Sequence, residues 1–510
     1  MTLPIQQDFK IRPVKIKKPD KLVSRKDKGR VAFQREKRMS SQFKPTTWAA
    51  INNATLPAEG AGNQTFDNRV LFGVTVGVPA FVAYTFGLPL WFFPILTLLL
   101  FLPLLACTLY LYSRFAPRYR NRVPLPGKPI EHYLTFHDPE LKSQYHGRNK
   151  IPMETFFEAY FVGKVDFNGD ALEIMELRHD WAAFQFTYGQ FKFFLTQWLP
   201  ETFWHSREQD ENQVRDHYDR GNDFYEAFLG PLMVYTSGII TDPTKKESLE
   251  ELQENKMKLI CEKLHMKEGD KHLDIGCGWG TLVAYAAKEY NTRSTGVTLA
   301  RNQVAFGEKR IEDWNVKGKA DLLCMDYRDI PKNHKYDKIT AVEMAEHVGL
   351  RRFQTFLTEV RELLEDDGLF YMQVAGLRAS WQYEDFIWGL FMAKYIFPGA
   401  DASTPLYWYI KQLETAGFEI HNVDTVGVHY SATLNRWYDN WLKNKEAMRA
   451  KYGDNLVRVW EIFLSWSTIV ARQGGATCFQ IVANKNRNSY DRTQLICNRT
   501  NPAAWTSKRG

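Results

Sequence analysis

Cysteine is scarce in this sequence, and the few cysteines present stand far apart. There are six in 510 residues, and none of them show the short paired spacing that disulfide frameworks and zinc sites use. They are Cys107, Cys261, Cys277, Cys324, Cys478 and Cys497. The pattern indicates neither a disulfide-stapled domain nor a metal site, and it fits a reducing, cytosol-facing environment.

Internal repeats are absent as well. The chain is long enough for about two to four domains with at least one large core. Aromatic residues make up 14% of the chain, a high share that suits a sizeable apolar pocket and also suits an ordinary core. Length and composition therefore leave the function open.

Acidic residues are few in the first 50 positions, which hold about fourteen Lys and Arg against about four Asp and Glu. The net charge of +7 thus comes from this leader, and the remainder of the chain is slightly acidic. Large apolar residues are also few, so residues 1–60 are expected to form a disordered basic leader. It is either a solvated tail or a segment that binds anionic lipid headgroups. Nucleic-acid binding is not expected, because no basic motif with interleaved aromatics follows.

Charge is missing altogether from Val70 to Ser113. A helix needs about 20 residues to cross the hydrocarbon core, so this stretch suffices for two spans. We expect them at about 70–87 and 90–112, with a break near Gly87–Pro89. The stretch lies too far into the chain to be a cleaved signal peptide. The alternative is a buried helix pair in a soluble domain.

The flanks of this stretch predict its orientation. Four arginines lie within residues 114–122, and the basic leader precedes the first span. Positive flanks stay in the cytosol, so we expect a transmembrane hairpin with both ends cytosolic. The endoplasmic reticulum is the expected membrane, and other internal membranes are the alternative. Trp91, near the turn, is a candidate interfacial anchor. The sequons at Asn53 and Asn63 should then lack sugar, and a glycan on Asn63 would overturn the orientation.

A glycine-rich turn stands at "DKHLDIGCGWGTLVAYAAKEY", residues 270–290. A short apolar run ends in glycines, and apolar residues then recur at helical spacing, which predicts strand, turn and helix. Glycines at 276, 278 and 280 let the backbone approach a ligand and point amides at it. Thr281 stands where a dinucleotide-binding turn has its third glycine. The D-x-G-x-G-x-G form resembles motif I of S-adenosylmethionine methyltransferases, in which the acidic residue and the glycines hold the amino-acid end of the cofactor.

Further strands and helices follow this turn in alternation. "RSTGVTLARNQVAFGEKR" reads as a second strand and helix, "KADLLCMDYRDIP" as a third strand and "YDKITAVEMAEHVGL" as a fourth. "RELLEDDGLFYMQVAG" adds a helix and a fifth strand. Alternation of this kind predicts an α/β fold with a doubly wound parallel sheet and ligands at the strand ends. The order matches a class I S-adenosylmethionine-dependent methyltransferase domain, Rossmann-like, with helical additions and preceded by the two-helix hairpin.

An ordered set of motifs narrows the family. "HYDRGNDFYEAFLG", "MVYTSG", "LDIGCGWGTL", "GVTLARNQ", "DYRD", "EHVG", "KYIFPGA" and "HYSATLNRWYDNW" occur in this order. Together they resemble the cyclopropane-fatty-acid synthase family of lipid methyltransferases, over about residues 210–485. The resemblance implies a methyltransferase domain at 206–485, preceded by a helical cap at 130–205 and followed by a polar tail at 486–510.

Two departures from the synthases concern their chemistry. Where the synthases carry Tyr-Ser-Cys, this chain has Tyr235, Thr236 and Ser237; where they carry His-Thr-Ile, it has Gln373 and two small residues. That Cys and His help hold a bicarbonate, the general base of the synthases. With the hairpin and the basic leader, the altered site resembles the fungal sphingolipid 9-methyltransferases. These place a methyl branch on carbon 9 of the unsaturated sphingoid base of ceramide or glucosylceramide, through a carbocation and a proton loss that restores the double bond.

The resemblance also implies roles for particular residues. Glu346 and Tyr430 are retained and are expected to position the base, either a bicarbonate or a water, while Ser237 and Gln373 mark where the catalytic site differs. The cofactor is expected to contact Tyr235, Thr236, Asp274, Gly276, Gly278, Gly280, Thr298, Gln303, Tyr327 and Arg328. His217 and Tyr218 are expected to shape a lid, and His347 to be structural. The aromatic run Phe386–Phe397 either lines an acyl tunnel or belongs to the core.

Two other functions remain open. The first is a membrane-bound cyclopropane-fatty-acyl-phospholipid synthase, which would form a ring instead of a branch. The second is a lipid-binding protein that retains the fold without catalysis; the intact glycine turn and "EHVG" argue against it. No nucleic-acid substrate is expected, since the basic charge lies in the leader.

Overall fold

The computed structural model describes residues 46–56, 68–115, 125–198, 220–380, 382–398 and 403–493. Several predictions lie outside these residues: the disorder of 1–45, the sequon at Asn63, the lid residues His217 and Tyr218, and the polar tail beyond 493. They stay predictions.

A seven-stranded sheet forms the centre of the fold, in the order β12-β13-β11-β10-β7-β8-β9. Its five parallel strands are those expected from the alternating pattern. They are β7 (Lys271–Ile275), β8 (Arg293–Thr298), β9 (Ala320–Cys324), β10 (Tyr336–Val342) and β11 (Leu364–Leu377). From β7 the chain adds β8 and β9 on one side and then returns to add β10 and β11 on the other side. The neighbouring carboxyl ends of β7 and β10 are therefore the switch point, where sheets of this kind bind ligands.

Two further strands make the sheet mixed instead of fully parallel. They are β12 (Phe418–Thr425) and β13 (Ala476–Lys485). β13 lies antiparallel between β11 and β12, so the end of the domain is inserted into the sheet. The prediction of an all-parallel sheet was incomplete, because it ended at the fifth strand.

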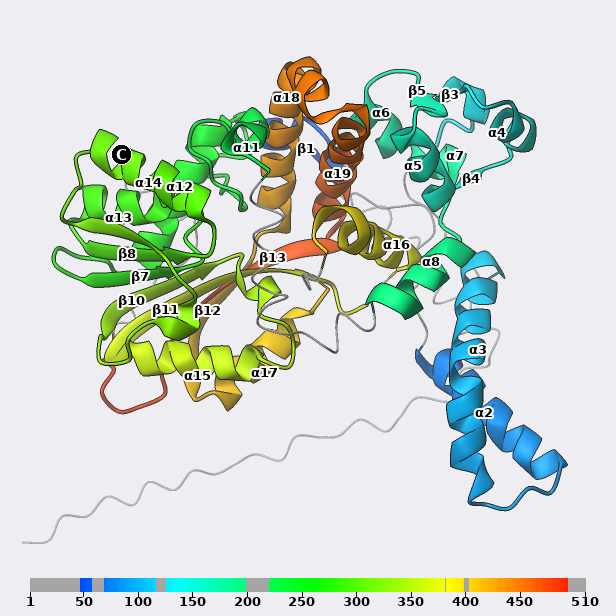
Figure 1. Ribbon diagram of the computed structural model, residues 1–510, viewed down its shortest axis with the longest axis horizontal. Helices are drawn as coiled ribbons and strands as arrows, with labels where there is room; N and C mark the ends of the chain where they lie inside the picture. Colours follow the sequence, from blue (N-terminus) through cyan, green and yellow to red (C-terminus); the bar gives the residue numbers. More distant parts are fainter. Residues whose placement is uncertain are drawn as a thin grey trace, which may run out of the picture. The chain divides into compact units, whose positions relative to one another are not determined.

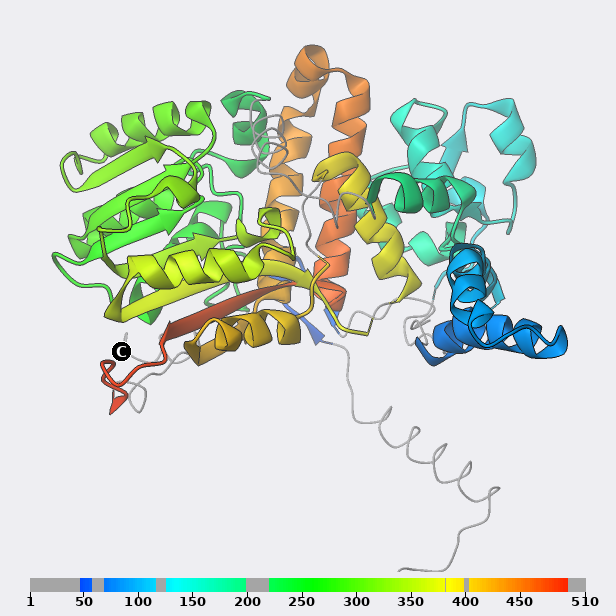
Figure 2. The same ribbon diagram turned by 60° about the horizontal axis from the view of Figure 1, so that its bottom comes forward.

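Helices cover both faces of the sheet (Figures 1 and 2). One face carries α12 (Leu249–Lys263), α13 (Thr281–Tyr290) and α14 (Arg301–Asp313). The other carries α15 (Phe353–Leu363) and α17 (Leu406–Thr415), whose apolar side chains form one core with the central strands. Ser248 and Glu251 form a reciprocal capping box that begins α12.

Two long helices follow β12 and lie side by side (Figure 2). They are α18 (Gly427–Tyr452) and α19 (Asp454–Gln473), separated by Gly453 at a φ of 88°. They bury four tryptophans in the largest apolar cluster: Trp437, Trp441, Trp460 and Trp466. The same cluster includes α11 (Asn222–Leu229) and the segment 130–198.

The segment 130–198 is more varied than the helical cap that we expected. Its helical pieces are η2 (Ile130–His132), α4 (Pro139–Gln144), α5 (Met153–Phe161), α6 (Ala171–Glu176), α7 (Arg178–Trp181), α8 (Tyr188–Phe193) and η3 (Phe194–Trp198). Between them lie two small sheets, which pair β3 (Leu134–Phe136) with β5 (Val165–Phe167) and β4 (Ile151–Pro152) with β6 (Ala182–Ala183). Strands of two or three residues are too short to leave a periodic pattern.

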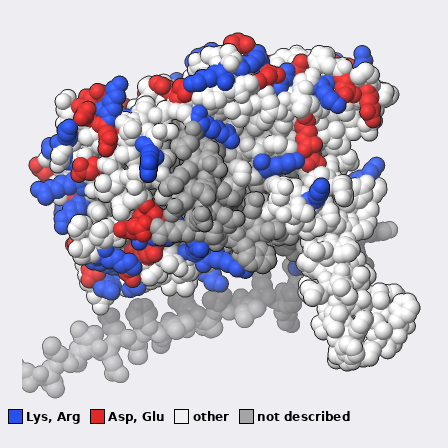
Figure 3. Space-filling view, viewed as in Figure 1, with Lys and Arg blue, Asp and Glu red and all other residues white. Residues whose placement is uncertain are grey.

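The uncharged stretch forms a helix pair, α2 (Asn68–Thr85) and α3 (Phe92–Phe115), close to the expected bounds. Gly87, at a φ of 60°, lies in the turn between them. Among the described residues, α3 is the helix long and apolar enough to cross a membrane, while the apolar part of α2, Arg69–Thr85, is shorter. Many of their large side chains are exposed, for example Leu98 of α3 to 78%. The face that Figure 3 shows is uncharged along most of the pair, which fits the absence of charge between Arg69 and Arg114.

The last turns of α3 contact the rest of the fold. Leu109 packs with Phe186, Phe193 and Phe386 in one apolar cluster. The backbone N–H of Phe186 donates to Ser113 Oγ at 3.1 Å. Because Phe386 belongs to α16 (Tyr383–Phe391), the helix pair is joined to the element that follows β11.

Part of the expected disordered leader is ordered. Residues 47–56 contain η1 (Ala49–Ile51) and end in β2 (Thr55–Leu56); β1 (Thr46–Thr47) precedes η1. Ala50 and Ile51 are buried in a small cluster with Leu252 and Ala432. The prediction of disorder over 1–60 is therefore wrong for this part, because its apolar residues find a packing site.

Candidate active site

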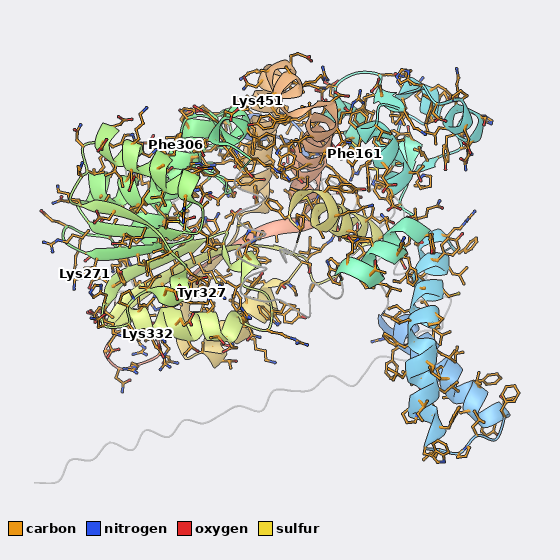
Figure 4. The ribbon with its side chains drawn as sticks, in the orientation of Figure 1. Phe161, Lys271, Phe306, Tyr327, Lys332 and Lys451 are labelled. Carbon is orange, nitrogen blue, oxygen red and sulfur yellow. The ribbon has the colours of Figure 1, made fainter. Side chains whose placement is uncertain are left out.

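A first cavity lies at the carboxyl ends of β7, β8, β9 and β10, and we call it the glycine-turn cavity. Figure 4 labels Lys271 at the amino end of β7 and Tyr327 towards the opposite edge, on the cavity side. Nine of the ten expected cofactor residues line it; Gly280 does not. The nine are Tyr235, Thr236, Asp274, Gly276, Gly278, Thr298, Gln303, Tyr327 and Arg328.

The three glycines of the turn share a left-handed backbone but differ in how much space surrounds them. All have positive φ: 74° at Gly276, 54° at Gly278 and 71° at Gly280. A Cβ on Gly276 would lie 2.6 Å from Met344, and one on Gly280 would lie 2.5 Å from Leu322. A Cβ on Gly278 would meet nothing within 4 Å, so this glycine leaves open space for a ligand.

The expectation that all three glycine amides face a ligand is wrong for two of them. Gly276 N–H donates to the Val297 carbonyl at 2.9 Å, and Gly280 N–H donates to the Cys277 carbonyl at 3.0 Å. The turn uses these amides to hold its own shape. A ligand can therefore approach the backbone closely at Gly278.

Asp274 is the last residue but one of β7 and lies in the cavity wall, where it is 3% exposed. Its Oδ1 accepts a 2.6 Å hydrogen bond from Thr340 Oγ1. Burial raises the pKa of the Asp274 carboxyl to about 7, against the lowering effect of Thr340 and of Lys256. A buried acid of this kind is suited to a cationic ligand group.

Lys256, on α12, is a cavity residue that the sequence did not reveal. Burial lowers the pKa of its ammonium to about 8, while the carboxylates of Glu343 and Asp274 act to raise it. A buried acid and a buried ammonium on one wall match the two charges of an amino-acid group. Its place in the middle of an amphipathic helix resembles that of many structural lysines, which is why no pattern pointed to it.

The remaining cofactor residues form the far wall of the cavity. Thr298 Oγ1 donates to Gln303 Oε1 at 2.7 Å, and both side chains are buried. Tyr327 and Arg328 lie in η4 (Tyr327–Asp329), where Arg328 Nε donates to Asp326 Oδ1 at 2.8 Å. Their contacts with a ligand stay predictions.

A second cavity is mostly apolar, and we call it the apolar cavity. It is lined by α16, η6 (Met392–Ile396), α18 and α19. The expected aromatic run contributes many of its walls: Phe386, Trp388, Gly389, Leu390, Met392, Ala393 and Phe397. Glu346 and Tyr430 also line it.

The two cavities meet at three shared residues, Tyr235, Glu343 and His347. We expected His347 to be structural, yet it faces both spaces. At these three residues a ligand in the glycine-turn cavity would contact a ligand in the apolar cavity.

Glu343 is the main residue that sequence analysis missed. It follows β10 directly and has a φ of 52°, a conformation that costs a non-glycine residue about 1 to 3 kcal/mol. Its carboxylate accepts hydrogen bonds from Ser237 N–H at 2.9 Å, Gln373 Nε2 at 2.7 Å and Tyr430 OH at 2.9 Å. The available signal was its position, an acidic residue at the carboxyl end of a switch-point strand.

The four expected catalytic residues are thereby brought to one place, three of them through Glu343. Ser237 contributes its backbone N–H, since its Oγ donates to the Gly238 carbonyl at 3.0 Å. Tyr371 OH and Gln480 Nε2 both donate to Gln373 Oε1, at 2.8 and 3.1 Å, which fixes the Gln373 amide.

Glu346 has a separate partner. Its Oε1 accepts a hydrogen bond from the backbone N–H of Ala375. Tyr430 OH donates to Glu343 Oε2, so the expected joint action of Glu346 and Tyr430 on one base stays a prediction. No cluster of three or more potential metal ligands occurs among the described residues.

The sheet order, the glycine turn and the switch-point cavity define the class I S-adenosylmethionine-dependent methyltransferase fold. Two solved structures share it: the cyclopropane synthase MmaA2 from Mycobacterium tuberculosis and the mycolic acid cyclopropane synthase CmaA1 complexed with SAH and CTAB. Each has a TM-score of 0.51 at 24% identity, covering 54% of this chain and 98% of the other.

Sequence comparison gives the family. Residues 205–481 match the family model described as mycolic acid cyclopropane synthetase. A sphingolipid C9-methyltransferase of Komagataella phaffii is 55% identical over 89% of this chain and 94% of its own. Sphingolipid C9-methyltransferase A of Emericella nidulans is 54% identical, and that of Candida albicans 51%, each over 88% of this chain and 88% and 89% of their own. The chain belongs to the mycolic acid cyclopropane synthetase family and, within it, to the sphingolipid C9-methyltransferases.

Proposed function

We propose that this protein is an S-adenosylmethionine-dependent C-methyltransferase that adds a methyl branch at carbon 9 of an unsaturated sphingoid base, in ceramide or glucosylceramide. The observation that carries the proposal is the meeting of the glycine-turn cavity with the apolar cavity at Tyr235, Glu343 and His347. A polar donor and a lipid acceptor would face one another there. The names of the relatives supply the substrate class.

The glycine-turn cavity fits S-adenosylmethionine by the chemistry of its walls. Asp274 would hold the ammonium and Lys256 the carboxylate of the amino-acid end, while the open space at Gly278 admits close approach. We assign Thr298 and Gln303 to the ribose and methionine ends and Tyr327 and Arg328 to the adenine. When bound, the cofactor supplies an electrophilic methyl group on a sulfonium.

The apolar cavity would hold the lipid and protect the charge that develops on it. An isolated alkene is a poor nucleophile, so it must lie at near-attack distance from the methyl group. Aromatic faces such as those of Tyr235 and Trp388 can stabilise a cation without trapping it. Exclusion of water prevents formation of an alcohol. Loss of the carbon 9 proton then leaves a branch, whereas loss from the new methyl would close a ring.

We further propose that α2 and α3 form the transmembrane hairpin, with the methyltransferase domain in the cytosol and the basic leader on anionic headgroups. The 24-residue length of α3 and the exposed apolar side chains of the pair support this. At 18 residues, α2 reaches about 27 Å, close to the hydrocarbon thickness. Leu109 of α3 packs on Phe386, which lines the apolar cavity, so a lipid would have a short path from the bilayer. The endoplasmic reticulum is the proposed membrane.

Expression in cells that make unsaturated, unbranched sphingoid bases tests the function. We expect a mass increase of one CH₂ on the sphingoid base, with the double bond retained, and transfer of label from methyl-labelled S-adenosylmethionine. Mass spectrometry with fragmentation locates the methyl group. A cyclopropane on phospholipid acyl chains would favour the synthase alternative, and binding of S-adenosylmethionine without any labelled lipid would favour the non-catalytic one.

The raised pKa of Asp274 predicts how cofactor affinity depends on pH. An ammonium group binds the ionised carboxylate, so below the free pKa of about 7 binding must release a proton. Affinity should therefore fall as pH decreases below about 7, by up to about tenfold per unit. Isothermal titration calorimetry in buffers of different ionisation enthalpy measures the released proton.

Asp274→Asn should weaken binding by about 2 kcal/mol or more and remove the proton release. Asp321→Asn, on an exposed position of β9, is the matched control and should leave both unchanged. Equal affinity at pH 5 and pH 8 in the unmodified protein would remove Asp274 from ammonium binding.

A further inference from the structure

The Glu343 carboxylate lies where the glycine-turn cavity meets the apolar cavity. It is an anionic group, only half-buried, at the point where a methyl donor and a lipid alkene would come together. Its position follows from the backbone, because the left-handed conformation at the end of β10 turns the side chain out of the strand direction. Glu343 N–H donates to the Gln373 carbonyl at 2.7 Å, which holds this turn.

The two oxygens of this carboxylate have different surroundings. Oε1 accepts from Ser237 N–H and Gln373 Nε2, and Cys478 Sγ lies 3.5 Å from it. Oε2 accepts from Tyr430 OH at 2.9 Å. A carboxylate oxygen has about two lone-pair sites, so Oε1 is fully engaged while Oε2 retains one. Tyr430, the partner of Oε2, lines the apolar cavity, as Glu343 itself does, so Oε2 lies beside the space proposed for the lipid.

The neighbours of the carboxylate are donors and not rival bases. Burial, reinforced by the charge of Glu343, raises the pKa of the Tyr430 phenol well above its usual range, so Tyr430 stays protonated. Burial likewise raises the pKa of the Cys478 thiol. Gln373 cannot accept a proton through its amide nitrogen, and its amide oxygen is bound by Tyr371 and Gln480.

We propose that Glu343 is the general base of the reaction: its Oε2 removes the proton from carbon 9 of the methylated lipid cation. The proposal rests on the proposed function. Ser237, Gln373 and Tyr430 are positioning residues that aim the carboxylate. Glu346 also lines the apolar cavity, where its Oε1 accepts a hydrogen bond from Ala375 N–H.

The step balances without a further reagent. The π electrons of the lipid double bond form the new C–C bond to the methyl carbon, and the S–CH₃ bond breaks with its electron pair left on sulfur. The lipid then carries a cation at carbon 8. Transfer of the carbon 9 proton to Oε2 returns the C–H electron pair to the C8=C9 bond. The protonated Glu343 loses its proton to water after product release.

A separate bicarbonate base does not fit this arrangement. Such an anion would need the N–H and O–H donors at the site, and Ser237, Gln373 and Tyr430 all give theirs to Glu343. A second anion against the Glu343 carboxylate would also meet like-charge repulsion. The chain therefore supplies the carboxylate that a bound ion would otherwise provide.

The test compares three variants of the full chain in detergent or lipid nanodiscs: Glu343→Gln, Glu343→Gly and Glu346→Gln. Turnover is measured as labelled methyl transfer to ceramide, and S-adenosylmethionine affinity by calorimetry. Glu343→Gln should lower turnover by about 100- to 10,000-fold with cofactor affinity nearly unchanged. Glu346→Gln should lower it less, because Glu346 is not the base.

Glu343→Gly allows a chemical rescue experiment, in which added anions would not restore turnover if Glu343 had only a structural role. Glycine accepts the left-handed backbone without strain, and loss of the side chain leaves the three donors facing a space the size of a small carboxylate. Added sodium formate or bicarbonate should restore turnover of this variant by about tenfold or more. Neither salt should restore Glu343→Gln, whose amide still fills the space.

The outcomes separate the two proposals. Absence of methyl transfer to any sphingolipid by the unmodified protein overturns the proposed function. If the unmodified protein is active, turnover above about one tenth in Glu343→Gln overturns the base assignment alone. So does a loss of wild-type turnover on removal of bicarbonate, or a Glu343→Gly variant that binds the cofactor but is rescued by neither anion.

Discussion

Replacement of Gly389 by phenylalanine is expected to abolish lipid methylation and to leave S-adenosylmethionine binding intact. Gly389 lies on α16 in the wall of the apolar cavity, and a Cβ there would meet nothing within 4 Å. A side chain added there therefore starts into open space, and a phenyl ring would occupy the place of the lipid. Because a misplacement of about 1 Å costs about 100-fold in rate, we expect turnover to fall by at least about that factor.

Gly389→Ala is the matched control. A single methyl group fits the open space, and alanine stabilises a helix by about 1 kcal/mol relative to glycine. Turnover of this variant should stay close to that of the unmodified protein. The measurement is labelled methyl transfer to ceramide, with cofactor affinity from calorimetry. Full activity of Gly389→Phe would mean that the lipid does not lie in this cavity.

Replacement of Arg178 by methionine is expected to destabilise the protein by about 3 to 5 kcal/mol. Arg178 Nε donates to Glu384 Oε1 at 2.5 Å, and the two side chains are 1% and 8% exposed. The pair joins α7 to α16 beneath the apolar cavity. Loss of the arginine leaves a buried carboxylate that is hydrogen-bonded to His179 and Trp466 but has lost its guanidinium partner. Chemical denaturation of the full chain in detergent measures the change.

The dependence on pH gives this prediction a second readout. Burial acts to raise the pKa of Glu384, yet Arg178 and His179 hold it well below its usual range. A lowered folded pKa contributes stability above the unfolded value of about 4.3, and this is lost as pH falls below it. The deficit of Arg178→Met should therefore shrink in acid. Lys332→Met, which breaks the exposed pair of Lys332 with Glu362, should cause a much smaller loss of stability at any pH, because solvent screens this pair. An equal loss in both variants would contradict the role of burial.

Much of the fold could be predicted because its signals are local and repeated. Alternation of apolar runs with helical spacing revealed β7 to β11, and the absence of charge revealed α2 and α3. β12 and β13 were missed for two reasons. β12 contains the polar stretch "EIHN", and both strands lie beyond the alternating region, separated from each other by the long helices α18 and α19. The pairing of β13 between β11 and β12 depends on contacts distant in sequence, which no window of residues contains.

The candidate site, like the fold, could be predicted from the sequence only where its residues belong to one local motif. Asp274, Gly276 and Gly278 belong to one continuous motif, and the cavity forms around them as expected. Glu343 lies three residues before Glu346, and the sequence offers no means to tell which of the two carboxylates meets Tyr430. That depends on a left-handed backbone at one residue and on a tyrosine from α18, both of which only the folded chain reveals.

The insertion of β13 has a consequence for how the enzyme is made. Because β13 follows the other six strands of the sheet in sequence and pairs with both β11 and β12, the sheet is complete only when β13 is in place. Tyr430 and Gln480, which hold Glu343 and Gln373, come from the same late portion of the chain. During synthesis the two apolar helices, α2 and α3, would therefore leave the ribosome well before the residues of the active site can assemble.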